Sequence, residues 1–123
     1  MSQTQKKMVL REDYRNNIKM PGRTLSIVVN DRGEKLEPVR RIRSRTGAHG
    51  EDIYVIYEPV YILRYNRSNS GKVRWAVYRA IPPNKVNRVR FSDLPTFIQN
   101  WLKEYAEQEG LELHEFEEES EFF

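Results

Sequence analysis

The sequence contains no cysteine, and its 123 residues include only two histidines, His49 and His114. A chain without cysteine forms no disulfide, no thiolate metal site and no cysteine nucleophile. Neither histidine has a second ligand at the spacing of a metal site, so we expect no metal and no cofactor. A P-loop, a dinucleotide-binding glycine pattern and a nucleophile elbow are also missing. These absences predict that the protein is not an enzyme.

Long apolar segments are missing as well. No segment approaches the ~20 consecutive apolar residues that span a bilayer, so we expect no membrane contact. Residues 1–9 are polar and lysine-bearing, unlike a secretory signal. The lack of cysteine fits a reducing compartment. We therefore expect an intracellular protein, either cytoplasmic or associated with the nucleoid.

Acidic residues are scarce in the first 90 residues, and basic residues are scarce in the rest of the chain. Residues 1–90 contain 20 basic and 8 acidic side chains, whereas residues 91–123 contain one basic side chain, Lys103, and 10 acidic ones. The two parts carry +12 and −9, which sum to the formal net charge of +3. A basic body of this kind favours a polyanionic partner.

Length and composition favour one domain with polar ends. A chain of 123 residues fits one compact domain, and its 2 Trp, 7 Tyr and 5 Phe are too many for a disordered chain. We expect a flexible basic N-terminal arm over 1–20, a single ordered domain over 21–110 and an acidic C-terminal tail over 111–123.

Alternation of apolar and polar residues predicts four β-strands, which we expect to form two antiparallel hairpins. Pro59 interrupts the third strand and predicts a bend or bulge there, because proline donates no hydrogen bond to a sheet. Polar turns separate the strands. The predicted strands span residues 24–30, 37–45, 52–65 and 73–81.

The apolar period changes to that of a helix after Ser92 and stops at Gly110. A helix with one apolar face needs a sheet to cover. We therefore expect an α+β fold, with an antiparallel sheet of four or more strands packed against one C-terminal amphipathic helix. The apolar face of the helix consists of Leu94, Phe97, Ile98, Trp101, Leu102 and Tyr105.

Arginine and tyrosine are interleaved along the predicted strands. On a strand, Arg41, Arg43 and Arg45 share one face at repeats of about 7 Å and form a track for successive phosphates. Tyrosine rings beside such a track stack on unpaired bases at about 1–3 kcal/mol per base. The alternative is that these rings are core residues beneath the helix. The residues that we expect to bind nucleic acid are Lys6, Lys7, Arg11, Arg41, Arg43, Arg45, Tyr57, Tyr61, Arg64, Tyr65, Arg67, Arg74, Trp75 and Tyr78.

The C-terminal segment alternates glutamate with aromatic residues and finishes at Phe122-Phe123. Here the chain resembles the acidic, aromatic-terminated tails of bacterial and phage single-stranded-DNA-binding proteins, although those tails commonly prefer Asp and end in Pro-Phe or one Phe. The resemblance implies a tail that competes with DNA and recruits replication, repair or transcription proteins. A purely solubilising tail is the alternative. The residues expected to bind partners are Phe116, Glu118, Glu119, Glu121, Phe122 and Phe123.

The order of strands followed by a helix is also similar to that of Whirly-type and positive-cofactor-type single-strand binders. This likeness covers the topology of residues 24–109 and includes no matching motif. Those proteins are dimers that bind on the sheet, so the resemblance implies a homodimer.

The sequence thus predicts a protein that binds single-stranded nucleic acid, DNA rather than RNA, on an Arg/Tyr-rich sheet. One alternative is a duplex-DNA-binding transcriptional or chromatin factor, although the expected helix is not basic. Another is a protein-interaction module whose acidic tail docks on a neighbouring copy or on a basic partner.

Overall fold

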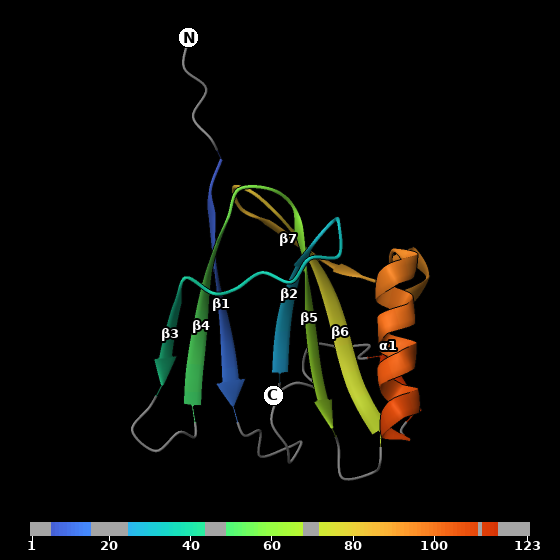
Figure 1. The fold of residues 1–123 in the computed structure, drawn as a ribbon. Helices are drawn as coiled ribbons and strands as arrows, with labels where there is room; N and C mark the ends of the chain where they lie inside the picture. Colours follow the sequence, from blue (N-terminus) through green and yellow to red (C-terminus); the bar gives the residue numbers. More distant parts are fainter. Residues whose placement is uncertain (1–5, 16–24, 44–48, 68–71, 111, 116–123) are drawn as a thin grey trace.

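Two β-sheets and one long helix form the part of the chain that the computed structural model describes, which is residues 6–15, 25–43, 49–67, 72–110 and 112–115 (Figure 1). The helices are the short 3-10 helix η1 (Phe91–Asp93) and α1 (Thr96–Glu109). The strands are β1 (Met8–Arg15), β2 (Leu25–Asn30), β3 (Arg40–Arg43), β4 (His49–Ile56), β5 (Val60–Arg67), β6 (Lys72–Ile81), β7 (Lys85–Val89) and β8 (Glu112–Glu115).

The first sheet, which we call the small sheet, is antiparallel and has the strand order β1-β4-β3. Its inner face follows the alternation of β1 and β4, because Leu10 pairs with Tyr54 in register and both side chains are buried. β3 forms one edge, and all four of its residues are exposed. The small sheet therefore has one buried face and one arginine-rich edge.

The second sheet, which we call the large sheet, has five strands. β2, β5, β6 and β7 are antiparallel neighbours in that order, and β8 pairs in parallel with the beginning of β6. β7 pairs with residues Val77–Ile81 of the same strand, whereas β8 pairs with Lys72–Trp75. The two short strands therefore share one edge of β6.

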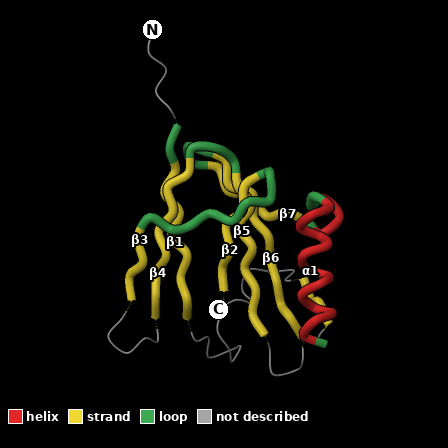
Figure 2. Tube along the Cα trace, viewed as in Figure 1, coloured by secondary structure: helices red, strands yellow, loops and turns green. Residues whose placement is uncertain are grey.

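One hydrophobic cluster joins the two sheets. The loop of residues 31–39 crosses from β2 to β3 (Figure 2) and closes this core, since Leu36 packs against it and donates its backbone N–H to the Val28 carbonyl at 2.8 Å. Burial of such side chains is the main contribution to folding free energy. The buried members of the cluster are Leu10, Val28, Tyr54, Ile56, Val60, Ile62, Ala76, Tyr78 and Ala80.

α1 covers the opposite face of the large sheet. Leu94, Ile98 and Leu102 are at most 5% exposed and pack against Leu63 and neighbouring side chains of that sheet. The helix ends at Gly110, whose φ of 64° is a left-handed conformation that glycine adopts without steric cost. The helical period therefore places an apolar stripe on the sheet, as the sequence predicts.

The α+β class, the C-terminal helix and four antiparallel strands packed against it are confirmed. The first predicted hairpin is wrong, because β2 pairs with β5 and β3 pairs with β4. Val28 is buried and its neighbours Ile27 and Val29 pack beneath α1, so β2 belongs inside the molecule. The predicted strand 52–65 divides near Pro59 into β4 and β5, which enter different sheets.

The predicted arm over residues 1–20 contains a strand rather than only mobile chain. β1 pairs with β4 over eight residues, and Leu10 and Glu12 are buried. The many charges of this segment obscure an alternation of inward-facing Met8, Leu10 and Glu12. In the predicted tail over 111–123, β8 belongs to the large sheet, and residues 116–123 lie outside the described residues.

Candidate nucleic-acid interface

Two of the aromatic residues predicted to stack on bases belong to the core instead. Trp75 is 2% exposed and packs beneath α1, and Tyr78 is 5% exposed in the cluster between the sheets. A buried ring offers no face to a base, so the prediction for both is corrected. Tyr61 is half-buried, with the Arg79 guanidinium 4.3 Å from its ring centre. Tyr57, in the β4–β5 connection, is 52% exposed.

Arg64 also has a structural position. Its Nε and Nη2 donate to the two carboxylate oxygens of Glu12 at 2.9 and 3.0 Å, which links the large sheet to the small sheet. The Ser26 hydroxyl donates to the same carboxylate at 2.6 Å. Arg64 also lies 4.7 Å from the ring centre of Tyr78. Arg64 therefore links the two sheets through Glu12, and its side chain is 34% exposed.

The outer face of the small sheet brings two exposed arginines into one row. Ile53 of β4 pairs in register with Arg11 of β1 on one side and with Arg40 of β3 on the other. Residues directly opposite on neighbouring strands share a face, and strands lie about 4.8 Å apart. The row Arg11–Ile53–Arg40 thus presents two cations about 10 Å apart with an apolar side chain between them.

Apolar side chains surround this row and remain partly open to solvent. Val9 is 48% exposed and Ile42 is 39% exposed, while Val55 and Ile53 are half-buried. α1 packs against the large sheet, and no other helix or strand of the described residues packs on this face (Figure 1). We call the surface formed by Val9, Arg11, Arg40, Ile42, Ile53 and Val55 the outer face. Glu51, which pairs in register with Ile42, lies on the same face.

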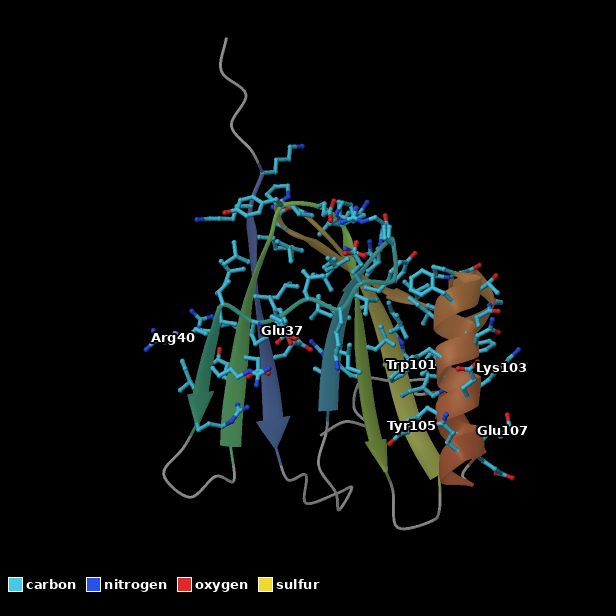
Figure 3. The ribbon with its side chains drawn as sticks, in the orientation of Figure 1. Glu37, Arg40, Trp101, Lys103, Tyr105 and Glu107 are labelled. Carbon is cyan, nitrogen blue, oxygen red and sulfur yellow. The ribbon has the colours of Figure 1, made fainter. Side chains whose placement is uncertain are left out.

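The cations on the small sheet differ in how they are paired. Arg11 Nη1 lies 3.0 Å from Glu51 Oε1, an exposed ion pair of low strength. Lys6, Lys7 and Arg40 are exposed and form no salt bridge with any residue that the structure describes. Figure 3 shows the Arg40 side chain directed away from the body of the protein. These three cations are available to an anion without breaking an existing ion pair.

Arg41 and Arg43 share the inner face of the β3 edge, as their parity predicts. Arg43 Nη1 lies 3.3 Å from Asp52 Oδ1, and Arg41 Nε lies 3.9 Å from the same oxygen. Asp52 is buried, whereas the two arginine side chains are 44% and 56% exposed. Arg41 also lies 3.5 Å from Glu37. One buried carboxylate thus holds two solvent-facing arginines.

Two ionisable groups near these contacts have shifted pKa values. Burial raises the pKa of Tyr54, and the nearby Asp52 and Glu12 carboxylates raise it further because they disfavour a second anion. In the turn after β2, a hydrogen bond from Arg79 lowers the pKa of Asp31. Both shifts describe structural contacts away from the outer face.

The remaining predicted site residues are placed only in part. Tyr65 and Arg67 lie in β5 and Arg74 lies in β6 by their backbone positions. The predicted residues outside the described part of the chain are Arg45, Phe116, Glu118, Glu119, Glu121, Phe122 and Phe123.

Sequence reasoning missed Arg40 and the apolar residues beside it. Parity placed Arg40 opposite to the arginine track, and it took the pairing register to align Arg40 with Arg11 through Ile53. It also missed Asp52, because a single acid at the start of a β-rich run has no distinguishing pattern. The sequence does place Val9 and Arg11 two positions apart, and Ile53 and Val55 likewise, so each pair shares one face of its strand.

The opposite side of the molecule has a different charge. α1 contains Lys103 as its only basic residue, together with Glu104, Glu107 and Glu109. Lys103 and Glu107 point away from the sheet, whereas Trp101 and Tyr105 lie on the side of the helix nearer to it (Figure 3). The cationic small sheet and the acidic helix are therefore at opposite ends of the fold (Figure 1).

Comparison with protein-family models finds no matching family, and comparisons with curated proteins and with solved structures find no match either. Among the described helices, none combines the length and the apolar composition that crossing a membrane requires. The fold and the site together define an α+β protein in which no described helix or strand covers the arginine-bearing outer face of the small sheet.

Proposed function

We propose that the protein binds single-stranded nucleic acid, DNA in preference to RNA, on the outer face of the small sheet. The observation that carries the proposal is the row Arg11–Ile53–Arg40 on a sheet face that no described element covers. Cations follow the phosphate backbone, while apolar and aromatic side chains receive the faces of unpaired bases. The proposed role is binding, without catalysis and without a cofactor.

The composition of the outer face favours a strand with unpaired bases over a duplex. Val9, Ile42 and Ile53 offer an apolar surface that unpaired bases match better than a duplex does, because a duplex presents phosphates and groove edges instead. The exposed ring of Tyr57 follows β4 at one end of this face and is a candidate for stacking. α1 is acidic and offers no basic helix for a major groove.

A fluorescence-anisotropy titration with single-stranded and duplex oligonucleotides of equal length tests the proposal. Arg40→Gln and Arg11→Gln should each weaken binding and reduce the slope of log K against log salt by about 0.7, since each removes one phosphate contact. Tyr57→Ala should weaken binding by about 1–3 kcal/mol if the ring stacks on a base.

Lys103→Gln provides the matched control for these variants. It removes the same unit of charge from an exposed site on α1, away from the outer face, so it should leave the salt slope unchanged. Equal effects of Lys103→Gln and Arg40→Gln would show that only net charge matters. Absence of single-strand binding at low salt would end the proposal, and a preference for duplex would select the transcriptional or chromatin alternative.

We further propose that the acidic tail competes with nucleic acid for the cationic surface and recruits replication, repair or transcription proteins. Its support is the charge of residues 111–123, which contain six glutamates and no lysine or arginine. Deletion of residues 116–123 leaves β8 intact and should tighten binding at low salt. A variant with Gln in place of Glu117, Glu118, Glu119 and Glu121 keeps the length and should behave in the same way. Unchanged affinity in both would remove the competitor role.

A protein-interaction module is the second candidate, because exposed apolar side chains such as Val9 and Ile42 are also suited to a protein contact. A homodimer formed through the outer face is one form of it. Light scattering across concentration, with Ile42→Ser as the variant, distinguishes this candidate. Association that Ile42→Ser abolishes, together with no affinity for oligonucleotides, would favour it.

A further inference from the structure

Asp52 is a buried carboxylate that contacts two solvent-exposed arginines. Its side chain is 2% exposed, yet its Oδ1 lies 3.3 Å from Arg43 and 3.9 Å from Arg41, both of which extend into solvent. A buried carboxylate is costly unless it is paired and hydrogen-bonded. The contact therefore fixes two exposed cations by means of a group that solvent does not reach.

Gly50 adds a second constraint on Arg43. The two residues pair in register across β3 and β4, and a Cβ at Gly50 would lie 2.7 Å from Arg43 Nη1 and 3.2 Å from its Cδ. The absence of a side chain thus lets the Arg43 stem and guanidinium lie flat on the β4 backbone. Arg43 therefore pairs with the Asp52 carboxylate and lies over the backbone of Gly50.

We propose that Asp52 is a positioning residue that preorganises Arg41 and Arg43 for the phosphates of a bound strand where that strand passes from the outer face around the exposed β3 edge, since β3 is an edge strand and all four of its residues are exposed. This inference rests on the proposed function. An arginine that is already ordered loses less side-chain entropy when it binds, and ordering one long side chain weakens affinity about two- to twelvefold. A carboxylate that pairs with a guanidinium fixes the orientation of the guanidinium, and the planar guanidinium matches phosphate geometry.

Asp52→Asn separates this role from simple electrostatics. The substitution raises the net charge of the protein by one, so charge alone predicts tighter binding of a polyanion. Loss of positioning predicts the opposite, and we expect affinity for a single-stranded oligonucleotide to fall about fivefold or more. Glu51→Gln is the matched control, because it removes an equal charge from an acid paired with Arg11 and should tighten binding.

Two further variants exclude a general structural effect. Gly50→Ala displaces the flexible end of Arg43 without altering charge and should also weaken binding, with the fold verified by circular dichroism. In a background of Arg41→Gln and Arg43→Gln, Asp52→Asn should no longer weaken binding, because the side chains that Asp52 positions are gone.

The outcomes distinguish a failure of the positioning role of Asp52 from a failure of the proposed function. If Asp52→Asn binds more tightly, as Glu51→Gln does, or weakens binding equally in the background without the two arginines, the positioning role is wrong although the protein binds. If the wild-type protein does not bind single strands at all, the proposed function fails, and the positioning role fails with it.

Discussion

Replacing Arg64 with leucine removes the ion pair that links the two sheets. Arg64 donates two hydrogen bonds to Glu12, whose side chain is 3% exposed. Leucine fills part of the space but donates nothing, so Glu12 keeps only the hydrogen bond from Ser26 among the contacts of the described residues. The variant therefore leaves a buried carboxylate without its cation.

The expected loss of stability follows from these contacts. Removing one partner of a buried ion pair costs about 3–5 kcal/mol. The Arg64 side chain is 34% exposed, so solvent already screens the pair and we expect about 2–3 kcal/mol from this source. The lost contact with the Tyr78 ring adds about 0.5–1 kcal/mol. A total near 3 kcal/mol is a large part of the ~5–15 kcal/mol that stabilises a typical domain.

Urea denaturation of a double-mutant cycle measures this loss. The cycle compares wild type with Arg64→Leu, Glu12→Leu and the double variant, followed by circular dichroism and by fluorescence of the buried Trp75. Because two apolar side chains leave no buried charge, the double variant should be more stable than Arg64→Leu alone. A loss below about 1 kcal/mol for Arg64→Leu, or strictly additive losses, would refute the assigned role.

Two further predictions concern the large sheet and its surroundings. Ile98→Ala should lower the free energy of unfolding by about 2–5 kcal/mol, because Ile98 is 1% exposed on the side of α1 that packs against the large sheet. Phe97→Ala on the same helix should cost less, because Phe97 is 38% exposed. The contact with Arg79 lowers the pKa of Asp31 in the folded protein below its ordinary value of 3.8, so the unfolded state binds more protons. The contribution of Asp31 to the free energy of unfolding is therefore fully present above pH 3.8. It is lost as the pH falls through the lower pKa of the folded state. Since Asp31 is 57% exposed, this contribution is about half a kcal/mol or less. The measurement is the difference in urea midpoint between wild type and Asp31→Asn. This difference should be constant above about pH 5 and disappear at lower pH.

Local patterns were sufficient for the elements with a clear period. The helix follows from the spacing of Leu94, Ile98 and Leu102, and Gly110 ends it in the expected conformation. Strands β2, β5 and β6 follow from alternation and from their β-branched residues. These signals are local, because they depend only on side chains within one turn or one strand.

Local patterns could not predict that the strands divide into two sheets. A bend at Pro59 is visible in the sequence, but whether the next residues return to the same sheet depends on which partner buries more apolar surface. β1 was missed because Glu12 is charged and is buried only with the help of Arg64, which lies 52 positions away. Charge compensation over such a distance has no local signal.

The candidate site shows the same limit. Composition indicated an arginine and tyrosine surface, and parity correctly paired Arg41 with Arg43 on one face of β3. The exposure of each ring could not be predicted, because Tyr57 and Tyr78 occupy segments of similar composition. Burial depends on which face the partner sheet covers.

The sequence by itself determined the helix, strands β2, β5 and β6 and the separation of charge along the chain, because period and composition are properties of neighbouring residues. Only the tertiary structure decided that Trp75 and Tyr78 are core, that Arg64 joins the sheets and that Arg11 and Arg40 meet across Ile53. These outcomes depend on strand register and on which faces are covered. Both are set by the burial of apolar surface contributed by residues far apart in the chain.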